Sequence, residues 1–216
     1  MEETMEKPPA TRKGMGRPVG SSREASLARI LPAARKLFAE QGYGKTTFKQ
    51  VGKAVGMTHA ALYGYFPSKA ALYQATCEDA QNLLLAEYAE AIRDQKTLRE
   101  ILRAFLLAGA RAHDGDPSIT GLLGALPLEI RRHPEVAELL QDRQNATLQL
   151  LIDAFARAQE RGEISDRNSP EDQVVAILGA SVGIALVNLG LDRDRLMDAI
   201  EVFIDLIESR LFTAPS

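Results

Sequence analysis

Apolar residues recur at three- and four-residue steps along most of the chain, which is the spacing of one face of an α-helix. The first such segment begins at Ser22 and ends at Gly42, a residue typical of helix C-termini. Pro32 lies inside it, removes one backbone donor and predicts a bend. No segment shows the alternation of a β-strand, and the sequence has no internal repeat. The pattern therefore predicts an all-α protein.

Short helices separated by Gly and Pro residues are predicted after this first helix. One is capped by Thr46 or Thr47, and the next is capped by Thr58 and runs through Phe66. Ser68 then caps a long helix of about 25 residues. Two short helices joined by a turn of three or four residues are typical of a helix-turn-helix unit.

The rest of the chain predicts a larger helical region. Further helices are expected near residues 97–112, 118–131, 134–161, 170–190 and 193–212, which gives about nine helices in all. The first residues carry Pro, Gly and basic side chains without an apolar period, so they are predicted to form a disordered basic arm. The predicted parts are the arm over 1–21, a helix-turn-helix domain over 22–68 and a ligand-sensing and dimerisation domain over 69–216.

Composition excludes several classes of protein. With 45% hydrophobic and 25% charged residues, the chain resembles an ordinary soluble globular protein, and a single cysteine excludes a disulfide within it. The longest apolar run, residues 174–191, contains Asn188 and is flanked by Asp172 and Asp192, so we expect no membrane span. The first residues lack the apolar segment of a secretory signal. These features predict a cytoplasmic protein.

The net charge of −3 conceals a strong asymmetry along the chain. Residues 1–70 hold 12 Lys+Arg and 5 Asp+Glu, whereas residues 71–216 hold 14 and 24. A basic region on an acidic body indicates a polyanionic partner, because attraction to phosphates requires clustered positive charge. The alternative is a basic surface that is merely solvated.

The most specific pattern is TTFKQVGKAVGMTHAALYGYFPSKAAL, over residues 46–72. It resembles the DNA-binding domain of the TetR family of transcriptional regulators, and the resemblance covers roughly residues 23–75. The positions in register are Thr46-Thr47, Val51, Gly56-Met57-Thr58, Leu62-Tyr63, Tyr65-Phe66 and Ser68-Lys69. Gly52 stands where the family has Ala, and Ala70 stands where it has an acidic residue. Neither departure removes a predicted DNA contact.

The resemblance implies a DNA-binding transcriptional regulator, most often a repressor. A recognition helix enters the major groove end-on, and the third predicted helix fits that role. His59, Ala60 and Gly64 are candidates for contacts with base edges, while Tyr63 and Tyr65 present hydroxyls suited to phosphates. The predicted DNA contacts are Arg17, Lys45, Thr46, Thr47, Thr58, His59, Ala60, Tyr63, Gly64, Tyr65 and Lys69.

Each of these contacts has a purely structural alternative. Thr47 is also an N-cap, and the two tyrosines could fill the core. Lys69 lies in the first turn of a helix, where its charge opposes the helix dipole, so we expect it to need an external anion such as a DNA phosphate. We expect Arg17 to reach into the minor groove of the DNA. The alternative is that Arg17 belongs to a tail that binds nothing specific.

The last two predicted helices are apolar around most of their circumference. Such helices require burial on two sides, and Gly179 and Gly183 would allow a close approach of two backbones. We therefore expect a two-fold homodimer through residues 170–190 and 193–212 that binds a pseudo-palindromic, double-stranded DNA operator. The alternative is a fully internal helix in a monomer.

The resemblance also implies a small-molecule effector in the C-terminal domain, whose binding would shift the helix that begins at Ser68 and release the operator. An apolar lining favours a hydrophobic effector. The same residues could be plain core. The predicted lining consists of Leu84, Tyr88, Phe105, Leu123, Leu126, Leu151, Phe155 and Leu178.

Other chemistries have weaker support. Possible metal ligands are His113, Asp114, Asp116, Glu129 and His133. Their spacing matches no metal site, so we expect no metal and no cofactor. Cys77 could sense oxidants, but the neighbouring acids Glu78 and Asp79 disfavour its thiolate. No enzyme signature is present, and the alternative function is a helical protein-interaction module without specific DNA readout.

Overall fold

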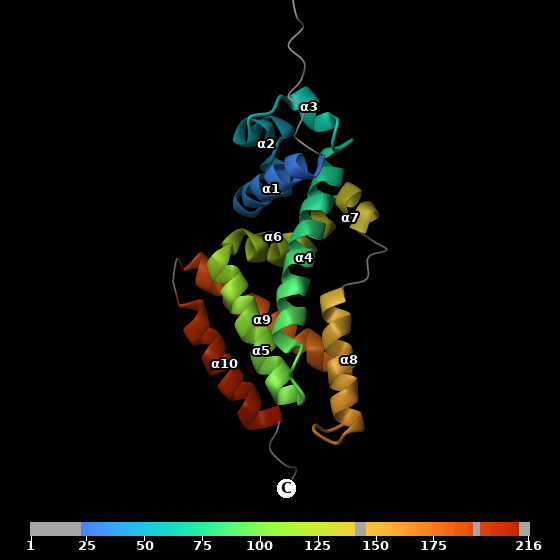
Figure 1. Cartoon of the computed structure of the whole chain (residues 1–216), viewed down its shortest axis with the longest axis vertical. Coiled ribbons are helices and arrows are strands. Elements are labelled where there is room, and N and C mark those ends of the chain that lie inside the picture. Colours follow the sequence, from blue (N-terminus) through green and yellow to red (C-terminus); the bar gives the residue numbers. More distant parts are fainter. Residues whose placement is uncertain (1–22, 141–145, 192–194, 212–216) are drawn as a thin grey trace, which may run out of the picture.

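The computed structural model describes residues 23–140, 146–191 and 195–211, and in these ranges the chain forms ten helices and no strand. The all-α prediction is therefore confirmed (Figure 1). The helices are α1 (Arg23–Lys45), α2 (Phe48–Val55), α3 (His59–Tyr63), α4 (Lys69–Ile92), α5 (Leu98–Gly115), α6 (Pro117–Arg132), α7 (Pro134–Leu140), α8 (Ala146–Glu160), α9 (Pro170–Gly190) and α10 (Leu196–Leu211). The predicted arm over 1–21, including Arg17, lies outside the described residues.

One predicted helix boundary was wrong. The regular part of the first helix ends at Gly42 as predicted, because Gly42 has a non-helical φ of 76°, a conformation that favours glycine, and after this kink α1 continues to Lys45. The single helix expected over 134–161 is two helices, α7 and α8. Val136 of α7 is buried in one core and Leu151 of α8 in another, so a continuous apolar stripe in the sequence serves two separate cores.

The first core lies within α1, α2, α3 and the start of α4, which together we call the head. Its centre is aromatic, with the rings of Phe38 and Tyr43 both packed edge-on against Tyr73 at centroid distances of 4.8 and 5.2 Å. Helices α6 and α7 also contribute side chains, including Ile119 and Val136. The head therefore shares its hydrophobic core with α6 and α7 and does not form an independent domain (Figure 1).

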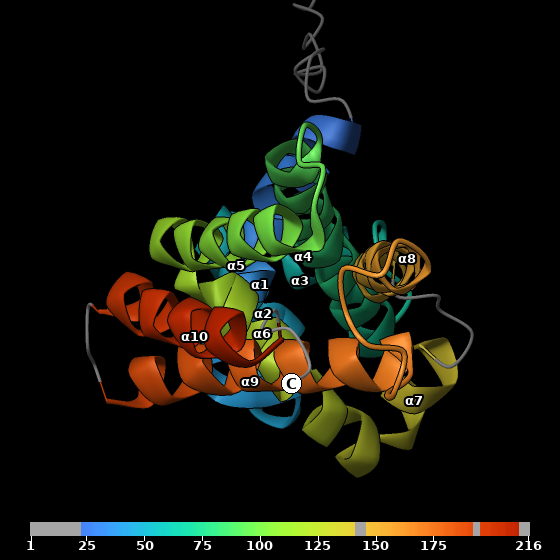
Figure 2. The same cartoon turned by 90° about the horizontal axis from the view of Figure 1, so that it is seen from below.

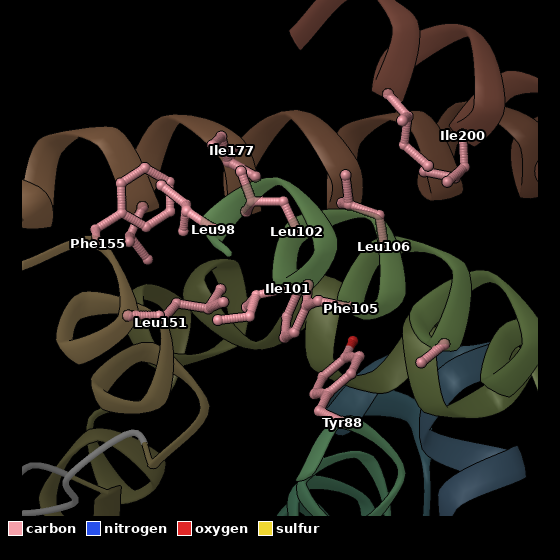
Figure 3. Close-up of a cluster of buried hydrophobic side chains, with 14 of the residues drawn as sticks. Tyr88, Leu98, Ile101, Leu102, Phe105, Leu106, Leu151, Phe155, Ile177 and Ile200 are labelled. Carbon is pink, nitrogen blue, oxygen red and sulfur yellow. The ribbon is translucent and has the colours of Figure 1, made fainter. Parts of the chain in front are cut away.

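The second core joins the lower half of α4 with α5, α8, α9 and α10, which we call the body. Tyr88 and Phe105 stack with ring centroids 3.9 Å apart, and Leu151 and Phe155 of α8 are fully buried (Figure 3). Helices α9 and α10 lie side by side along one flank of the body (Figure 2). Helix α4 contributes to both cores and so connects the two parts.

An ion-pair network centred on one buried arginine joins α1 to α4 and α6. Arg35 of α1 is only 4% exposed, and its guanidinium donates to Asp79 of α4 and to Asp116 at the start of α6, both at 2.8 Å. Burial raises the pKa of Asp116, but hydrogen bonds from Ser118 and Arg35 outweigh that and hold it below its ordinary range. Three helices are thus tied to one buried side chain.

Helix α9 combines a long apolar sequence with contacts to several other helices. Residues 170–190 are long and apolar enough to cross a membrane by length and composition, with a mean hydropathy of 1.9 over the most apolar window. In the structure the helix packs against α5, α6, α8 and α10. One such helix is weak evidence for a membrane span, because helices inside helical domains pass the same test.

Candidate nucleic-acid interface and body cavity

The outer surface of the head is formed by α3 and the start of α2. Helix α3 begins where the Thr58 hydroxyl accepts a hydrogen bond from Ala61 N at 3.1 Å, so the predicted cap is confirmed. Thr58, His59, Ala60 and Gly64 are all exposed. The helix therefore presents its N-terminal turn outward, which is the orientation that readout in a major groove requires.

Aromatic packing fixes the side chains on this surface. The buried Phe48 ring lies 4.7 Å from Tyr63 and 5.9 Å from His59, and those two rings are 5.0 Å apart. Tyr63 nevertheless remains 49% exposed, so its ring is held from below while its surface faces solvent. The Tyr63 ring therefore packs on the core with one face and remains available for a surface contact with the other.

Both threonines at the α1–α2 turn have well-defined partners. The exposed Thr47 caps α2, with its hydroxyl accepting from Gln50 N at 3.3 Å and donating to Gln50 Oε1 at 2.8 Å. Thr46 is fully buried, and its hydroxyl donates to the carbonyls of Gly42 and Leu37. The prediction that Thr46 contacts DNA is therefore wrong, because its side chain closes the turn from inside.

Lys69 also has partners within the chain. Its ammonium donates to the carbonyls of Tyr43 at 2.9 Å and Gly44 at 3.3 Å, and it lies 4.2 Å from the centre of the Tyr43 ring. The expectation that Lys69 needs an external anion is therefore wrong, since the C-terminal carbonyls of α1 already face its charge. Lys69 remains partly exposed, so a phosphate contact stays a prediction.

One cation beside α3 was missed by the sequence analysis. Arg23, at the start of α1, donates to the carbonyls of Gly64 and Tyr65, and its guanidinium lies 5.2 Å from the centre of the Tyr65 ring. Tyr65 is consequently partly buried, whereas Lys45 is exposed at the end of α1. No local signal reveals Arg23, because its partners are more than 40 residues away along the chain.

The body encloses a small cavity between α4, α5, α6, α9 and α10, with about 90 Å³ of room for water-sized molecules. Four of the eight predicted lining residues are there: Leu84, Tyr88, Phe105 and Leu123. The other lining residues are Leu106, Gly109, Ala110, Thr120, Gly124, Ser181, Val182, Ala185, Leu196 and Ile200. The lining contains no charged side chain.

The other four predicted lining residues lie elsewhere. Leu151 and Phe155 are fully buried in the body core, where they fill space instead of bordering it. Leu178 packs against the same core, and Leu126 packs against the head core. None of these four residues lines this cavity, and their place in a ligand site stays a prediction.

Tyr88 is the most unusual residue of the cavity wall. It is 9% exposed, and burial raises the pKa of its hydroxyl to about 12. Among the described residues this hydroxyl, which borders the cavity, makes no hydrogen bond. A methyl group at Gly109 would lie 3.0 Å from the Tyr88 oxygen, so the glycine provides the space for it.

An open apolar groove runs along α9 and α10 on the outside of the body. Its volume is about 510 Å³, and its lining includes Ile184, Val187, Leu191 and Val202. Val187 and Val202 are 62% and 60% exposed. Such an apolar surface is typical of a protein–protein interface.

The possible metal ligands and Cys77 have structural roles. Asp116 caps α6 and binds Arg35, while Glu129 lies 3.2 Å from His133 and accepts a hydrogen bond from Tyr43 N. Within the described ranges no three His, Cys, Asp or Glu residues are grouped as metal ligands. Cys77 is fully buried, which does not suit an oxidant sensor.

Comparison with known proteins agrees with this geometry. Residues 30–76 match the sequence profile of the bacterial regulatory proteins of the tetR family. The chain is 28% identical over 142 residues to the HTH-type transcriptional regulator UidR of Escherichia coli (strain K12), covering 66% of this chain and 70% of UidR. It superposes on Salmonella enterica GusR with a TM-score of 0.65 and 26% identity, covering 86% and 97% of the two chains. For the regulator FadR from Bacillus subtilis, solved with stearoyl-CoA, the TM-score is 0.71 at 19% identity, covering 83% and 96%.

Proposed function

We propose that this chain, a member of the TetR family of bacterial regulatory proteins, is a repressor that leaves its operator when a small apolar ligand binds in the body. One observation carries the DNA-binding part. The N-terminal turn of α3, with His59, Ala60 and Tyr63, faces solvent on a rigid aromatic support inside the segment that matches the family profile. A regulator of this kind acts without catalysis and works in the cytoplasm, where the chromosome is.

The DNA contacts of the proposed interface come from the tip of the head. His59, Ala60 and Gly64, which are small or exposed, contact base edges in this proposal. The remaining residues of the interface contact phosphates. The phosphate contacts are Lys45, Thr47, Thr58, Tyr63, Tyr65, Lys69 and the newly found Arg23. This division predicts which residues set sequence preference and which set affinity.

The active form is proposed to be a two-fold dimer through α9 and α10. The exposed apolar groove on these helices supports this, because an interface would bury Val187 and Val202. Within the described residues, and apart from the adjacent residues and the backbone of α9 itself, no atom lies within 4 Å of the positions that a methyl group would take at Gly179 and Gly183, so the glycines leave room for a partner helix. A dimer places two heads on half-sites about 34–36 Å apart, or multiples of that spacing.

Release by a ligand is supported by the position of the cavity. Its wall includes Leu84 and Tyr88 of α4, the helix whose first turn is fixed to the head through Lys69. A ligand weakens DNA binding only if it prefers the DNA-incompetent state, and by reciprocity DNA then weakens ligand binding. The FadR structure with stearoyl-CoA is a precedent for a bound ligand in this fold.

The test is selection of bound duplexes from a random DNA library by the full-length protein at near-physiological salt. We expect a pseudo-palindrome whose half-site spacing matches a two-fold dimer. Recovery of no motif, together with binding that depends only on salt, would replace this proposal with a helical interaction module. Sedimentation of the free protein would show separately whether the dimer exists.

A further inference from the structure

Two features meet at one point of the cavity wall. The Tyr88 ring stacks on the Phe105 ring and the residue is 9% exposed, yet within the described part of the chain its hydroxyl, which borders the cavity, makes no hydrogen bond. Gly109 lies inside α5 without a positive φ, so no turn requires it there. It leaves the space that the Tyr88 oxygen occupies. Both features are explained if that oxygen binds something that enters the cavity.

The other polar groups of the wall are also hydroxyls. Thr120 and Ser181 face the same cavity, and Ser181 already donates its proton to the Leu178 carbonyl at 3.0 Å. Among the lining residues, no Lys, Arg, His, Asp or Glu is present to balance a charge. A carboxylate or an ammonium group would therefore lose its hydration on entry without gaining a counter-ion.

We propose that the cavity binds an uncharged, mainly apolar molecule with an oxygen function such as an alcohol, ketone or ester, and that Tyr88 donates a hydrogen bond to that oxygen. This inference rests on the proposed function, in which the body binds the effector, and adds the chemical class of that effector. The Tyr88 proton is available for this bond because burial raises the pKa of the hydroxyl to about 12, so it stays protonated at neutral pH.

Four single-ring probes with one skeleton test the proposal: toluene, benzyl alcohol, benzoate and benzylammonium. Single rings suit a cavity of about 90 Å³. Binding to the full-length protein without DNA is followed by methyl NMR of Leu123 and Ile200 in the cavity wall, which excludes signals from ions on the basic head. We expect benzyl alcohol to bind about fivefold more tightly than toluene and at least 100-fold more tightly than either ion.

The variant Tyr88→Phe identifies the group responsible. It should bind toluene like the wild type and benzyl alcohol about fivefold more weakly. Its melting temperature without ligand should be unchanged or higher, because the deleted hydroxyl has no partner to lose. Tyr73→Phe, which deletes the hydroxyl of a buried tyrosine in the head core, is the matched control and should change neither probe binding nor cavity signals.

Several results would overturn the proposal. These are benzoate or benzylammonium binding within tenfold of benzyl alcohol, no shift of the cavity methyls by any neutral probe, or an alcohol preference that survives Tyr88→Phe. A lower melting temperature with unchanged binding would assign the hydroxyl a structural role instead. DNA selection is a separate measurement, so loss of the regulator proposal and loss of the ligand class can be told apart.

Discussion

The head and the body treat their polar groups in opposite ways. In the head, buried polar groups find partners inside the chain, as Thr46 and Arg35 do, and the aromatic and basic groups of its tip face outward. In the body, the described part of the chain leaves the Tyr88 hydroxyl and His113 Nδ1 without partners, and apolar side chains of α9 and α10 face solvent. The head therefore satisfies its buried polar groups within the chain, whereas the body leaves groups that the proposed ligand and the proposed partner chain would contact.

The largest predicted effect is a difference in stability between a variant in the body core and a variant in the cavity wall. Phe155→Ala should lower the free energy of unfolding by about 3–5 kcal/mol, because Phe155 is fully buried in the body core. Leu123→Ala should cost about 1–2 kcal/mol, since its side chain is only partly buried and already borders empty space. Urea unfolding monitored by circular dichroism measures both. Equal losses would mean that the cavity wall is packed as tightly as the core.

The next effect distinguishes a lysine of the head that stabilises the fold from one that only contacts DNA. Lys69→Met removes two hydrogen bonds to the Tyr43 and Gly44 carbonyls, so it should lower the free energy of unfolding by about 1–2 kcal/mol and weaken DNA binding. Lys45→Met should leave stability within about 0.5 kcal/mol, because Lys45 is exposed, and should still lower the salt dependence of DNA binding by about one unit of slope. Thermal unfolding and a salt titration of DNA affinity measure the two effects. A Lys69→Met protein of wild-type stability would contradict the supporting role.

A third effect concerns specificity at the tip of the head. Tyr63→Phe should weaken binding to every DNA sequence by about fivefold, because it removes one hydroxyl suited to a phosphate. His59→Ala should instead change the preferred base at one position of each half-site. Duplex selection followed by affinity measurement on matched operators distinguishes these outcomes. Lys96→Gln, an exposed cation at the far end of the body, is the control and should change neither. A uniform loss for His59→Ala would reclassify it as a backbone contact.

The smallest effect is a pH dependence that arises in the body. Burial lowers the pKa of His113 below its ordinary value of 6.5, only partly opposed by Asp114, so the unfolded chain binds the proton more readily than the folded one. Stability is therefore full above pH 6.5 and falls as the pH drops below it towards the lowered pKa. His113→Leu should remove this fall, as measured by urea unfolding over a pH series. An unchanged pH profile in the variant would contradict it.

The sequence predicted the head more accurately than the body because its determinants are local. The caps Thr47, Thr58 and Ser68 bond to residues three positions further on, so their spacing in the sequence is enough to reveal them. Lys69 and Arg23 could not be assigned in this way, because their partners lie tens of residues away and meet them only in the folded chain.

The cavity shows the same limit more strongly. Leu123 and Leu126 are three residues apart on α6, and both are partly buried and pack against the head core, yet only Leu123 also lines the cavity. Which side of a helix meets a cavity depends on how several helices pack against one another. The periodicity of apolar residues predicts that a side chain is buried, but it does not predict whether that side chain lines a cavity or packs only in a core.

The close contact between α6 and α1 has a mechanical consequence. Thr120 and Gly124 of α6 line the cavity, and between them a methyl group at Gly121 would lie 3.1 Å from Ala39 Cβ of α1. Long side chains absorb a small displacement by changing rotamer, whereas a glycine backbone against an alanine methyl has no rotamer to change. The contact between this turn of α6 and α1 therefore cannot absorb a displacement by side-chain rearrangement. A shift of the cavity wall towards α1 is expected to move α1 as well.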